Sequence, residues 1–272
     1  MTKRVICALA FVCVTTLCCT SCSDQKQDAW QLVWEENFDG DTFDSSCWSK
    51  IPRGKSDWNN YMSDFDSCYH VGSGLLTLRG LNNYSLPEDT ARFLTGGLYT
   101  KDKVGFSHGR LEIHAKLGNA TGAWPAFWLL PFDGTQWPDG GEIDIMENVG
   151  YDPDHIVGTA HTQRYNHTKG TQKSATLLIP TNSTAFHVYA LEWEEKEYRL
   201  YIDDKHYFTF VNENTGFAEW PFDKKFHLIL NLAIGGNWGG QQGIDDALFP
   251  HHFYIDYVRV YQKQANSVSS SK

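Results

Sequence analysis

The chain has 272 residues, which is enough for one large domain or two small ones with a substantial core. It carries 33 Asp and Glu residues against 23 Lys and Arg residues, and this acidic balance argues against nucleic acid as a partner, because phosphate binding needs a basic surface. The hydrophobic content of 41% excludes a multi-span membrane protein, and the 10 Trp, 13 Tyr and 16 Phe residues exclude wholesale disorder.

The first 22 residues have the pattern of an export signal. Residues 1–4 include two basic side chains, residues 5–14 are apolar, and small residues precede a break. This pattern is typical of a secretory signal and is too short for a membrane span. Residues 20–22 (Thr-Ser-Cys) resemble a bacterial lipoprotein processing site, where cleavage leaves a lipid-modified cysteine. We therefore predict that residues 1–22 are the signal with Cys22 lipidated, and that residues 23–29 form a tether.

Residues 1–22 contain five of the seven cysteines, which leaves two for the body of the chain. The residues around Cys22 also bear on cellular location. The acidic Asp24 just after Cys22 resembles the signal that accompanies surface export in Bacteroides-like bacteria. We expect an outer membrane lipoprotein that faces the cell surface, whereas a plain secretory signal would give a periplasmic or secreted protein. Cys47 and Cys68 remain in the body, where they either pair in an oxidising compartment or act as small buried hydrophobes.

The body of the chain predicts a single all-β domain over residues 30–264. Apolar and polar residues alternate with a period of two along several segments, and no stretch keeps a helical period for three turns. The predicted strands are, in chain order, residues 75–79, 97–100, 111–117, 126–130, 143–147, 156–161, 188–193, 198–202, 207–211, 228–234 and 254–261. Many short strands without an internal linker favour a two-sheet sandwich. Residues 265–272 are expected to be a frayed tail.

Three acidic residues in one predicted strand carry the strongest chemical signal. Glu142 and Asp144 are two positions apart and therefore share a strand face. Glu147 would fall on the other face under perfect alternation. One extra residue in a bulge at residues 145–146 would restore the parity and bring Glu147 beside the other two.

Three like charges on one strand face are unfavourable for folding, and a half-buried cleft would force at least one of them to keep its proton. Glycoside hydrolysis needs this combination, one ionised carboxylate and one protonated acid. The alternative is a solvated acidic edge. Three acids on an outer face with no Lys or Arg between them would be a poor surface, which favours the catalytic interpretation.

The sequence Glu-Ile-Asp-Ile-Met-Glu at residues 142–147 resembles the signature of glycoside hydrolase family 16 in its bulged, laminarinase-like form. Further similar segments follow the expected order over roughly residues 30–262: residues 122–131, 186–193, 231–238 and 255–261. The resemblance implies a β-jelly-roll sandwich of two antiparallel sheets with a concave substrate cleft. It also implies a retaining mechanism in which Glu142 is the nucleophile, Glu147 is the general acid/base, and Asp144 tunes the nucleophile.

Several aromatic residues are candidates for binding a sugar chain. Trp124 and Trp128 are four positions apart, so a strand places both on one face, and relatives use the matching tryptophans beside the cleavage point; the alternative for both is the core. Trp238 lies in a Gly-rich loop and would form a platform at the cleft edge. Trp58 and Asn60 lie where many laminarinases carry a Gly-Asn-Asn-Glu-like segment, so subsites far from the cleavage point are expected to differ.

Two more candidates come from the resemblance. His161 matches a family position near the acid/base, where a structural histidine is the alternative, and Arg110 matches a position with a role in the cleft or in sheet pairing. Many relatives hold a structural calcium with an aspartate that matches Asp256, but Asn37 stands where they usually have Glu. No cofactor is therefore expected to be required, and a structural calcium is left open.

The sequence as a whole predicts a monomeric, retaining endo-β-glucanase that hydrolyses β-1,3-glucan or mixed-linkage β-1,3/1,4-glucan. Its partner would be the polysaccharide, with no nucleic acid and with membrane contact only through the lipid anchor. One alternative is an endo-hydrolase of an algal galactan of the agar or porphyran type, because such relatives share the bulge. Another is a non-catalytic glycan-binding surface module, against which the intact Glu142, Asp144 and Glu147 argue.

Overall fold

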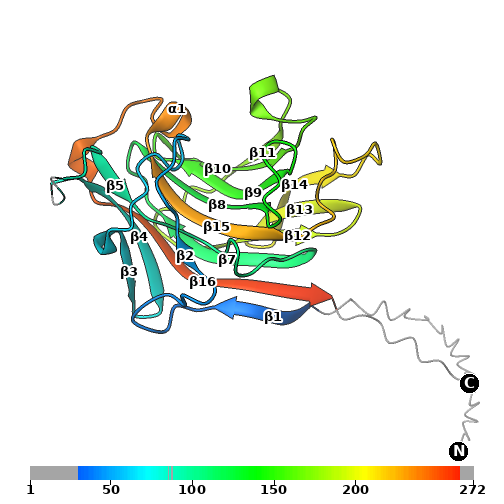
Figure 1. Ribbon diagram of the computed structural model, residues 1–272, viewed down its shortest axis with the longest axis horizontal. Coiled ribbons are helices and arrows are strands. Elements are labelled where there is room, and N and C mark those ends of the chain that lie inside the picture. Colours follow the sequence, from blue (N-terminus) through cyan, green and yellow to red (C-terminus); the bar gives the residue numbers. More distant parts are fainter. Residues whose placement is uncertain (1–29, 85, 87, 264–272) are drawn as a thin grey trace, which may run out of the picture.

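Alternation of buried and more exposed side chains marks several of the strands. In β7 (Gly109–Leu117), Leu111 and Ile113 are fully buried, whereas Glu112 between them is only partly buried. The computed structural model describes residues 30–84, 86 and 88–263, and it arranges strands of this kind in two antiparallel β-sheets packed face to face (Figure 1). The predicted all-β sandwich is confirmed.

The larger sheet, here called sheet A, has nine strands. Its main order is β14-β13-β12-β7-β16-β4-β3, with β1 paired to β16 and β5 paired to β4. The bounds are β1 (Trp30–Glu36), β3 (Tyr69–Gly72), β4 (Leu75–Asn82), β5 (Phe93–Thr95), β12 (His187–Trp193), β13 (Glu197–Ile202), β14 (Lys205–Val211) and β16 (His251–Lys263).

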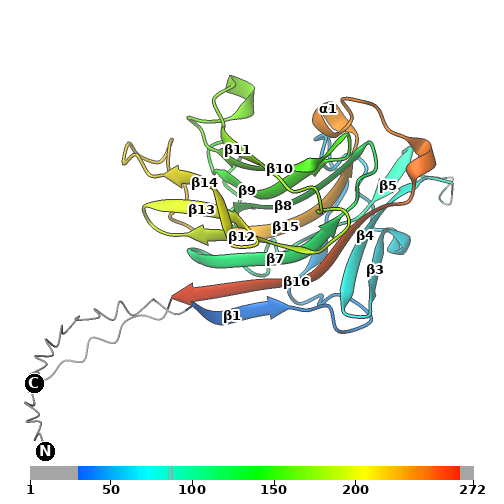
Figure 2. The ribbon, with the colours of Figure 1, turned by 180° about the vertical axis from the view of Figure 1, so that it is seen from behind.

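The second sheet, sheet B, has seven strands in the order β11-β10-β9-β8-β15-β6-β2. Its bounds are β2 (Ser49–Lys50), β6 (Gly97–Tyr99), β8 (Ala123–Pro131), β9 (Glu142–Val149), β10 (Asp152–His161), β11 (Lys173–Leu178) and β15 (Phe226–Ile234). The views from the front and from behind both show β15, β8, β9 and β10 side by side along a curved sheet (Figures 1 and 2).

Within residues 30–84, 86 and 88–263, helical structure is confined to short turns. These are α1 (Gly236–Gly239) and the 3-10 turns Asp66–Cys68, His167–Lys169 and Asp246–Leu248. Within the described residues, no helix has the length and apolar character needed to cross a membrane.

The core lies between the two sheets and is built from their inward-facing side chains. Phe127, Ile145 and Leu230 of sheet B are fully buried in one cluster with Leu111 and Leu191 of sheet A. Burying an apolar side chain of this size stabilises the fold by roughly 1.5–3 kcal/mol. The core therefore accounts for the apolar residues that alternate with the three acids of β9.

Some predictions lie outside this description. The signal at residues 1–22 with Cys22, the tether at residues 23–29 and the tail at residues 265–272 belong to parts of the chain that the structure does not describe. The sequence left open whether Cys47 and Cys68 form a disulfide, and the structure shows both as free thiols.

Candidate active site

A β-bulge in β9 places all three acids on the outer face of sheet B. Against β8, Phe127 pairs with Met146 and Trp128 pairs with Asp144, which leaves Ile145 as an extra residue. The register against β10 shifts at the same place. The predicted bulge is therefore confirmed, and it lets Glu147 face the same way as Asp144 while Ile145 and Met146 both remain buried.

Burial makes the three carboxyl groups hold their protons unusually tightly. It raises the pKa of Glu142 to about 8, with the charge of Glu147 as the second cause, and it raises the pKa of Glu147 to about 7. Burial and the charges of both glutamates raise the pKa of Asp144 well above its ordinary value. A carboxylate taken out of water beside other carboxylates is favoured in its neutral form, so the cluster retains protons at neutral pH.

Hydrogen bonds decide how the cluster shares its remaining charge. Bonds from Asp144 and Trp137 lower the pKa of Glu142, and the bond to Glu142 raises the pKa of Asp144. The raised pKa of Asp144 favours its protonated form, and a protonated Asp144 can donate to Glu142. Once Glu147 is also protonated, its charge no longer opposes the ionisation of Glu142. When Glu142 is ionised and Glu147 is protonated, the Glu142 carboxylate has two hydrogen-bond donors beside it, Asp144 and Trp137.

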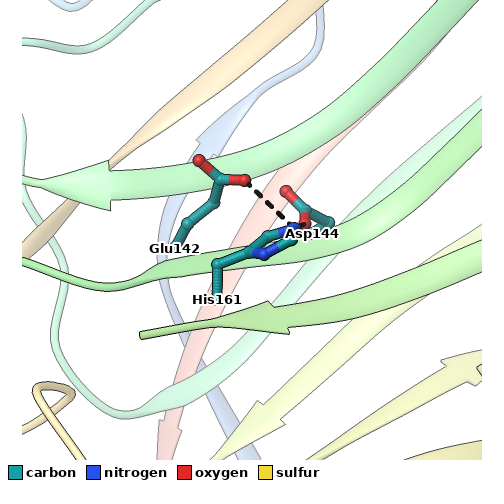
Figure 3. Close-up of side chains that lie close together, drawn as sticks. All are labelled: Glu142, Asp144 and His161. Carbon is teal, nitrogen blue, oxygen red and sulfur yellow. Dashed lines mark ion pairs between the residues drawn. The ribbon is translucent and has the colours of Figure 1, made fainter. Parts of the chain in front are cut away.

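His161 closes one side of this cluster (Figure 3). Its Nε2 atom lies 3.6 Å from Glu142 Oε1 and 3.4 Å from Asp144 Oδ2. Burial lowers the pKa of His161 to about 4, so the ring is neutral at pH 7 and does not cancel the negative charge. The sequence predicts His161 near the acid/base; the structure places it beside Glu142 and Asp144, and its register partner is Glu142 rather than Glu147.

Glu142, Asp144 and His161 are also the one group among the described residues whose ligand atoms could hold a metal ion, since these atoms lie within 4.8 Å of one another. The open question of calcium concerns a different place. Asp256 Oδ2 lies 2.6 Å from His114 Nδ1, and Asn37 Oδ1 accepts a hydrogen bond from Arg259. Calcium takes six to eight oxygen ligands, so oxygens engaged with protein nitrogens do not fit it. The expectation that no cofactor is required stays untested.

Trp124 and Trp238 lie together beside Glu147. Trp124 Nε1 donates to Glu147 Oε1 at 3.1 Å, and the Trp238 ring meets the Trp124 ring edge-on, with centroids 5.3 Å apart. Both rings are partly exposed. They are therefore available to a sugar bound next to Glu147, as the sequence predicts.

Trp128 lies on the same face, with Asp144 as its register partner, but it is only 6% exposed. Its Nε1 donates to Asn231 Oδ1 at 2.6 Å. The ring of Trp58 covers it edge-on, with centroids 4.9 Å apart. Trp128 thus lies buried beneath the site, and Trp58 is the more exposed ring of the pair.

The loop that carries Trp58 rests on a small apolar cluster of its own, made of Ile51, Met62, Ala126, Trp128 and Ile229. The same loop is tied to α1, because Asp57 Oδ2 accepts a hydrogen bond from the backbone N–H of Asn237 at 2.7 Å. Asn60, predicted to bind substrate, has a buried Oδ1 atom without a hydrogen-bond partner in the described residues. The loop therefore forms a wall beside the outer face of sheet B.

The prediction that Arg110 lies in the cleft is wrong. Arg110 lies on β7 of sheet A, where its guanidinium contacts Glu112 at 2.5 Å, Glu192 at 3.0 Å and Asp204 at 3.2 Å. The alternation that buries Leu111 turns Arg110 to the outer face of sheet A, on the opposite side of the sandwich from the acids of β9.

Trp137 and His167 belong to the site although the sequence did not single them out. Trp137 lies in the β8–β9 loop and stacks on His167 from the β10–β11 connection, with centroids 4.8 Å apart and planes at 28°. His167 also meets His161 edge-on at 5.2 Å. A Trp-Pro pair close before the acidic strand was the available signal, but the meeting of two loops is not encoded by strand periodicity.

Comparison with known proteins agrees with this geometry. The family model Glycosyl hydrolases family 16 matches residues 67–259. A beta-glucanase of Rhodothermus marinus is 38% identical over 96% of both chains, and a keratan-sulfate endo-1,4-beta-galactosidase of Sphingobacterium multivorum is 32% identical over 86% of this chain and 55% of its own. The structure of the laminarinase from Rhodothermus marinus superposes with a TM-score of 0.82 at 40% identity, covering 87% of this chain and 99% of that one.

Proposed function

Because the chain belongs to glycosyl hydrolases family 16, we propose that it is a retaining endo-β-glucanase that hydrolyses β-1,3-glucan or mixed-linkage β-1,3/1,4-glucan. The bulge in β9 is the observation that carries the proposal, since it brings Glu142, Asp144 and Glu147 to one face. Their raised pKa values supply the protonated acid that glycoside hydrolysis needs near neutral pH.

We propose a separate role for each acid. Ionised Glu142 attacks the anomeric carbon, and protonated Glu147 gives its proton to the departing sugar oxygen, so that a covalent glycosyl-enzyme forms. Glu147, now ionised, takes a proton from the water that releases the sugar from Glu142. Asp144 remains protonated and donates to the Glu142 carboxylate, which holds the nucleophile in place between attacks.

The aromatic side chains are spread along the outer face of sheet B in a way that suits a chain of several sugars. Trp124 and Trp238 lie at Glu147, and Trp137 lies at Glu142. Trp58 stands beside Trp128 near the middle of the set. Pyranose rings have an apolar face that packs on such side chains, so we expect sugars to be held on both sides of the bond that is cleaved.

The substrate class is tested by incubating the protein with laminarin, cereal mixed-linkage glucan and agarose while reducing ends are followed. We expect release from one or both glucans. Release from agarose alone would favour the galactan alternative, for which the relationship to a keratan-sulfate galactosidase is the supporting observation. Binding without release from any of the three would identify a non-catalytic glycan-binding module.

Retention is tested by NMR of the first products. We expect the β-anomer to form first and the α-anomer to grow in later by mutarotation. An initial α-anomer would show that water attacks directly and that Glu142 is not a nucleophile.

We also propose that the protein is an outer membrane lipoprotein, anchored through Cys22 and displayed at the cell surface as a monomer. The support for the anchor and for surface display is the sequence of residues 1–29 alone. A Cys22→Ala variant is expected to leave the membrane fraction, and protease added to intact cells should degrade the wild-type protein. A variant that still fractionates with membranes would refute the anchor, and protection from protease would favour the periplasm.

A further inference from the structure

One hydrogen bond crosses the core between the two sheets and reaches the backbone of the acidic strand. Tyr207 Oη, from β14 of sheet A, donates to the Ile145 carbonyl of β9 at 2.9 Å. Ile145 is the extra residue of the bulge that turns Glu147 to the outer face. A bulge disrupts the strand ladder at its extra residue, so a buried carbonyl at this position needs a partner from elsewhere.

Tyr207 reaches that carbonyl because β14 has an irregularity of its own. In its register against β13, the pairing passes from Phe208 directly to His206, which leaves Tyr207 as an extra residue. Strict alternation from the buried Phe208 would turn Tyr207 outward. Tyr207 instead packs against the core together with Phe208. Two bulges, one in each sheet, therefore meet across the core through a single hydrogen bond.

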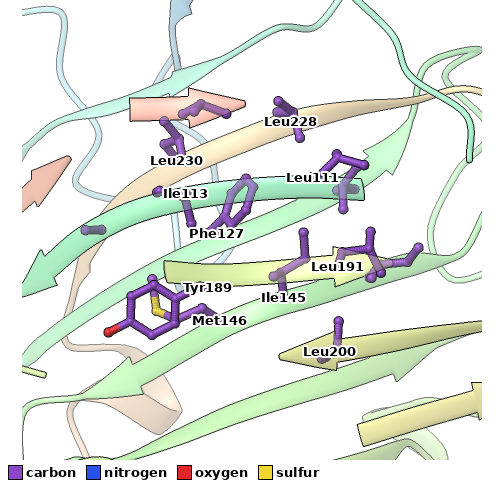
Figure 4. Close-up of a cluster of buried hydrophobic side chains, with 14 of the residues drawn as sticks. Leu111, Ile113, Phe127, Ile145, Met146, Tyr189, Leu191, Leu200, Leu228 and Leu230 are labelled. Atoms are coloured by element: carbon purple, nitrogen blue, oxygen red, sulfur yellow. The ribbon is translucent and has the colours of Figure 1, made fainter. Parts of the chain in front are cut away.

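Gly158 keeps the space between the two bulges open. It lies on β10 between Val157 and Thr159, where the register against β9 shifts. A Cβ atom at this position would lie 2.5 Å from Tyr207 Oη and would also collide with Leu200. Figure 4 shows Leu200 in the same buried cluster as Ile145. Any side chain at residue 158 would thus displace the hydroxyl from the Ile145 carbonyl.

We propose that Tyr207 is a positioning residue for Glu147, acting through the Ile145 carbonyl and the bulge of β9. This inference rests on the proposed function, because it assigns Tyr207 to the acid–base step. Without the hydroxyl, the Ile145 carbonyl loses its partner in the core, and the bulge no longer has a fixed conformation. Glu147 lies two residues beyond Ile145 and would lose its fixed direction, whereas Glu142 precedes the bulge.

The decisive variant is Tyr207→Phe, which keeps the ring and removes the hydroxyl. A dinitrophenolate leaves without protonation, so 2,4-dinitrophenyl β-laminaribioside tests the nucleophile without the acid. For hydrolysis of a β-1,3-glucan oligosaccharide we expect kcat/KM to fall about 10- to 100-fold, because a small misplacement of an acid is costly. For the dinitrophenyl glycoside we expect a loss of less than about 3-fold, since no proton is needed.

Tyr198→Phe is the matched control. Tyr198 lies in the same core on β13, and its hydroxyl is buried without a hydrogen-bond partner in the described part of the chain. We expect this variant to keep both activities. Equal losses on the two substrates in Tyr207→Phe would overturn the proposal, because they would indicate general damage to the core. An unchanged activity on the oligosaccharide would overturn it as well.

Amide hydrogen exchange gives a readout that does not depend on activity. We expect residues 145–148 to exchange at least about 10-fold faster in Tyr207→Phe than in the wild type or in Tyr198→Phe. Unchanged exchange there would overturn the proposal for Tyr207. A wild-type protein that releases no sugar would count against the glucanase function instead, so the two failures are distinguishable.

Gly158→Ala approaches the same contact from the other side. This variant keeps the hydroxyl but displaces it, so the selective loss on the oligosaccharide should recur even if Tyr207→Phe does not fold. If Gly158→Ala retained full activity on both substrates, the contact between the two bulges would have no role in positioning Glu147.

Discussion

Two clusters of acids lie on opposite faces of the sandwich, and they differ in what balances their charge. On the outer face of sheet A, Glu112 and Glu192 are paired with the guanidinium of Arg110, whose side chain is 11% exposed. On the outer face of sheet B, the three acids of β9 have no Lys or Arg within ion-pair distance among the described residues. Their one basic neighbour is the neutral ring of His161.

The difference explains why similar strand patterns give different chemistry. A carboxylate paired with a guanidinium takes part in charge-assisted hydrogen bonds that serve the structure. A buried carboxyl without such a partner keeps a proton that it can later donate. The presence or absence of one arginine therefore separates an ion-pair network from an acid–base site.

The largest expected effect is on turnover. Glu142→Gln removes the proposed nucleophile while keeping the shape of the side chain, so we expect kcat to fall by about 10⁴-fold or more. Binding of an oligosaccharide, measured by calorimetry, should persist. Glu112→Gln on sheet A is the control and should leave kcat unchanged. A Glu142→Gln variant with a tenth of wild-type turnover would contradict the assignment.

The next effect concerns stability on the other face. Arg110→Met leaves the partly buried Glu112 without its cation and removes one of the two arginines that contact Glu192, Arg199 being the other. We expect the free energy of unfolding to fall by about 1–3 kcal/mol in denaturant titrations, with kcat of the folded enzyme unchanged. A loss of kcat at unchanged stability would return Arg110 to the substrate site.

The third prediction concerns stability against pH. The folded-state pKa values of Glu142 and Glu147 are raised from 4.5 to about 8 and about 7, so the protons that this pair holds contribute stability that is full below pH 4.5 and is lost as the pH rises toward 8. Glu142→Gln has no such proton to lose. We expect its Tm at pH 8 to exceed that of the wild type by about 2–6 °C, with no such gain at pH 4.5.

Calorimetry of Glu112→Gln supplies the contrast for this prediction, because that side chain is paired with Arg110. It should show no gain in Tm at pH 8. Parallel Tm curves for the wild type and Glu142→Gln from pH 4.5 to pH 8 would mean that burial does not raise the pKa of Glu142.

The smallest expected effect is a shift in the pH profile of activity. The wild type should show a bell-shaped dependence of kcat/KM with both limbs above pH 4.5, because the pKa values of both glutamates are raised. The bond from Trp124 lowers the pKa of Glu147. Trp124→Phe keeps a ring without the donor, so the basic limb should move up by about half a pH unit. A downward shift would contradict this role.

Much of the site could be predicted because strand parity is a local property. The spacing of Glu142, Asp144 and Glu147 fixes their relative faces, and the mismatch at Glu147 predicts the bulge. Parity does not tell which sheet a strand joins, and the error at Arg110 has this origin. The role of Tyr207 could not be predicted for a related reason. Alternation turns its side chain outward, and only the irregularity in β14 brings it into the core.

The pairing of Trp137 with His167 could not be predicted either. The two residues are 30 positions apart in different connections, and their contact depends on how both loops fold over the end of sheet B. Loop conformations of this kind follow from tertiary packing rather than from a repeating pattern.

The small apolar cluster beneath the Trp58 loop has a consequence for how such an enzyme can diversify. Because this wall rests on Ile51, Met62 and Ile229 outside the main core, substitutions in it leave the packing between the sheets intact. Mutation can therefore reshape the contour that meets the polysaccharide while the acidic strand and its bulge stay the same. Adapting the enzyme to a different polysaccharide would then require new residues in the loop and no change in the catalytic residues.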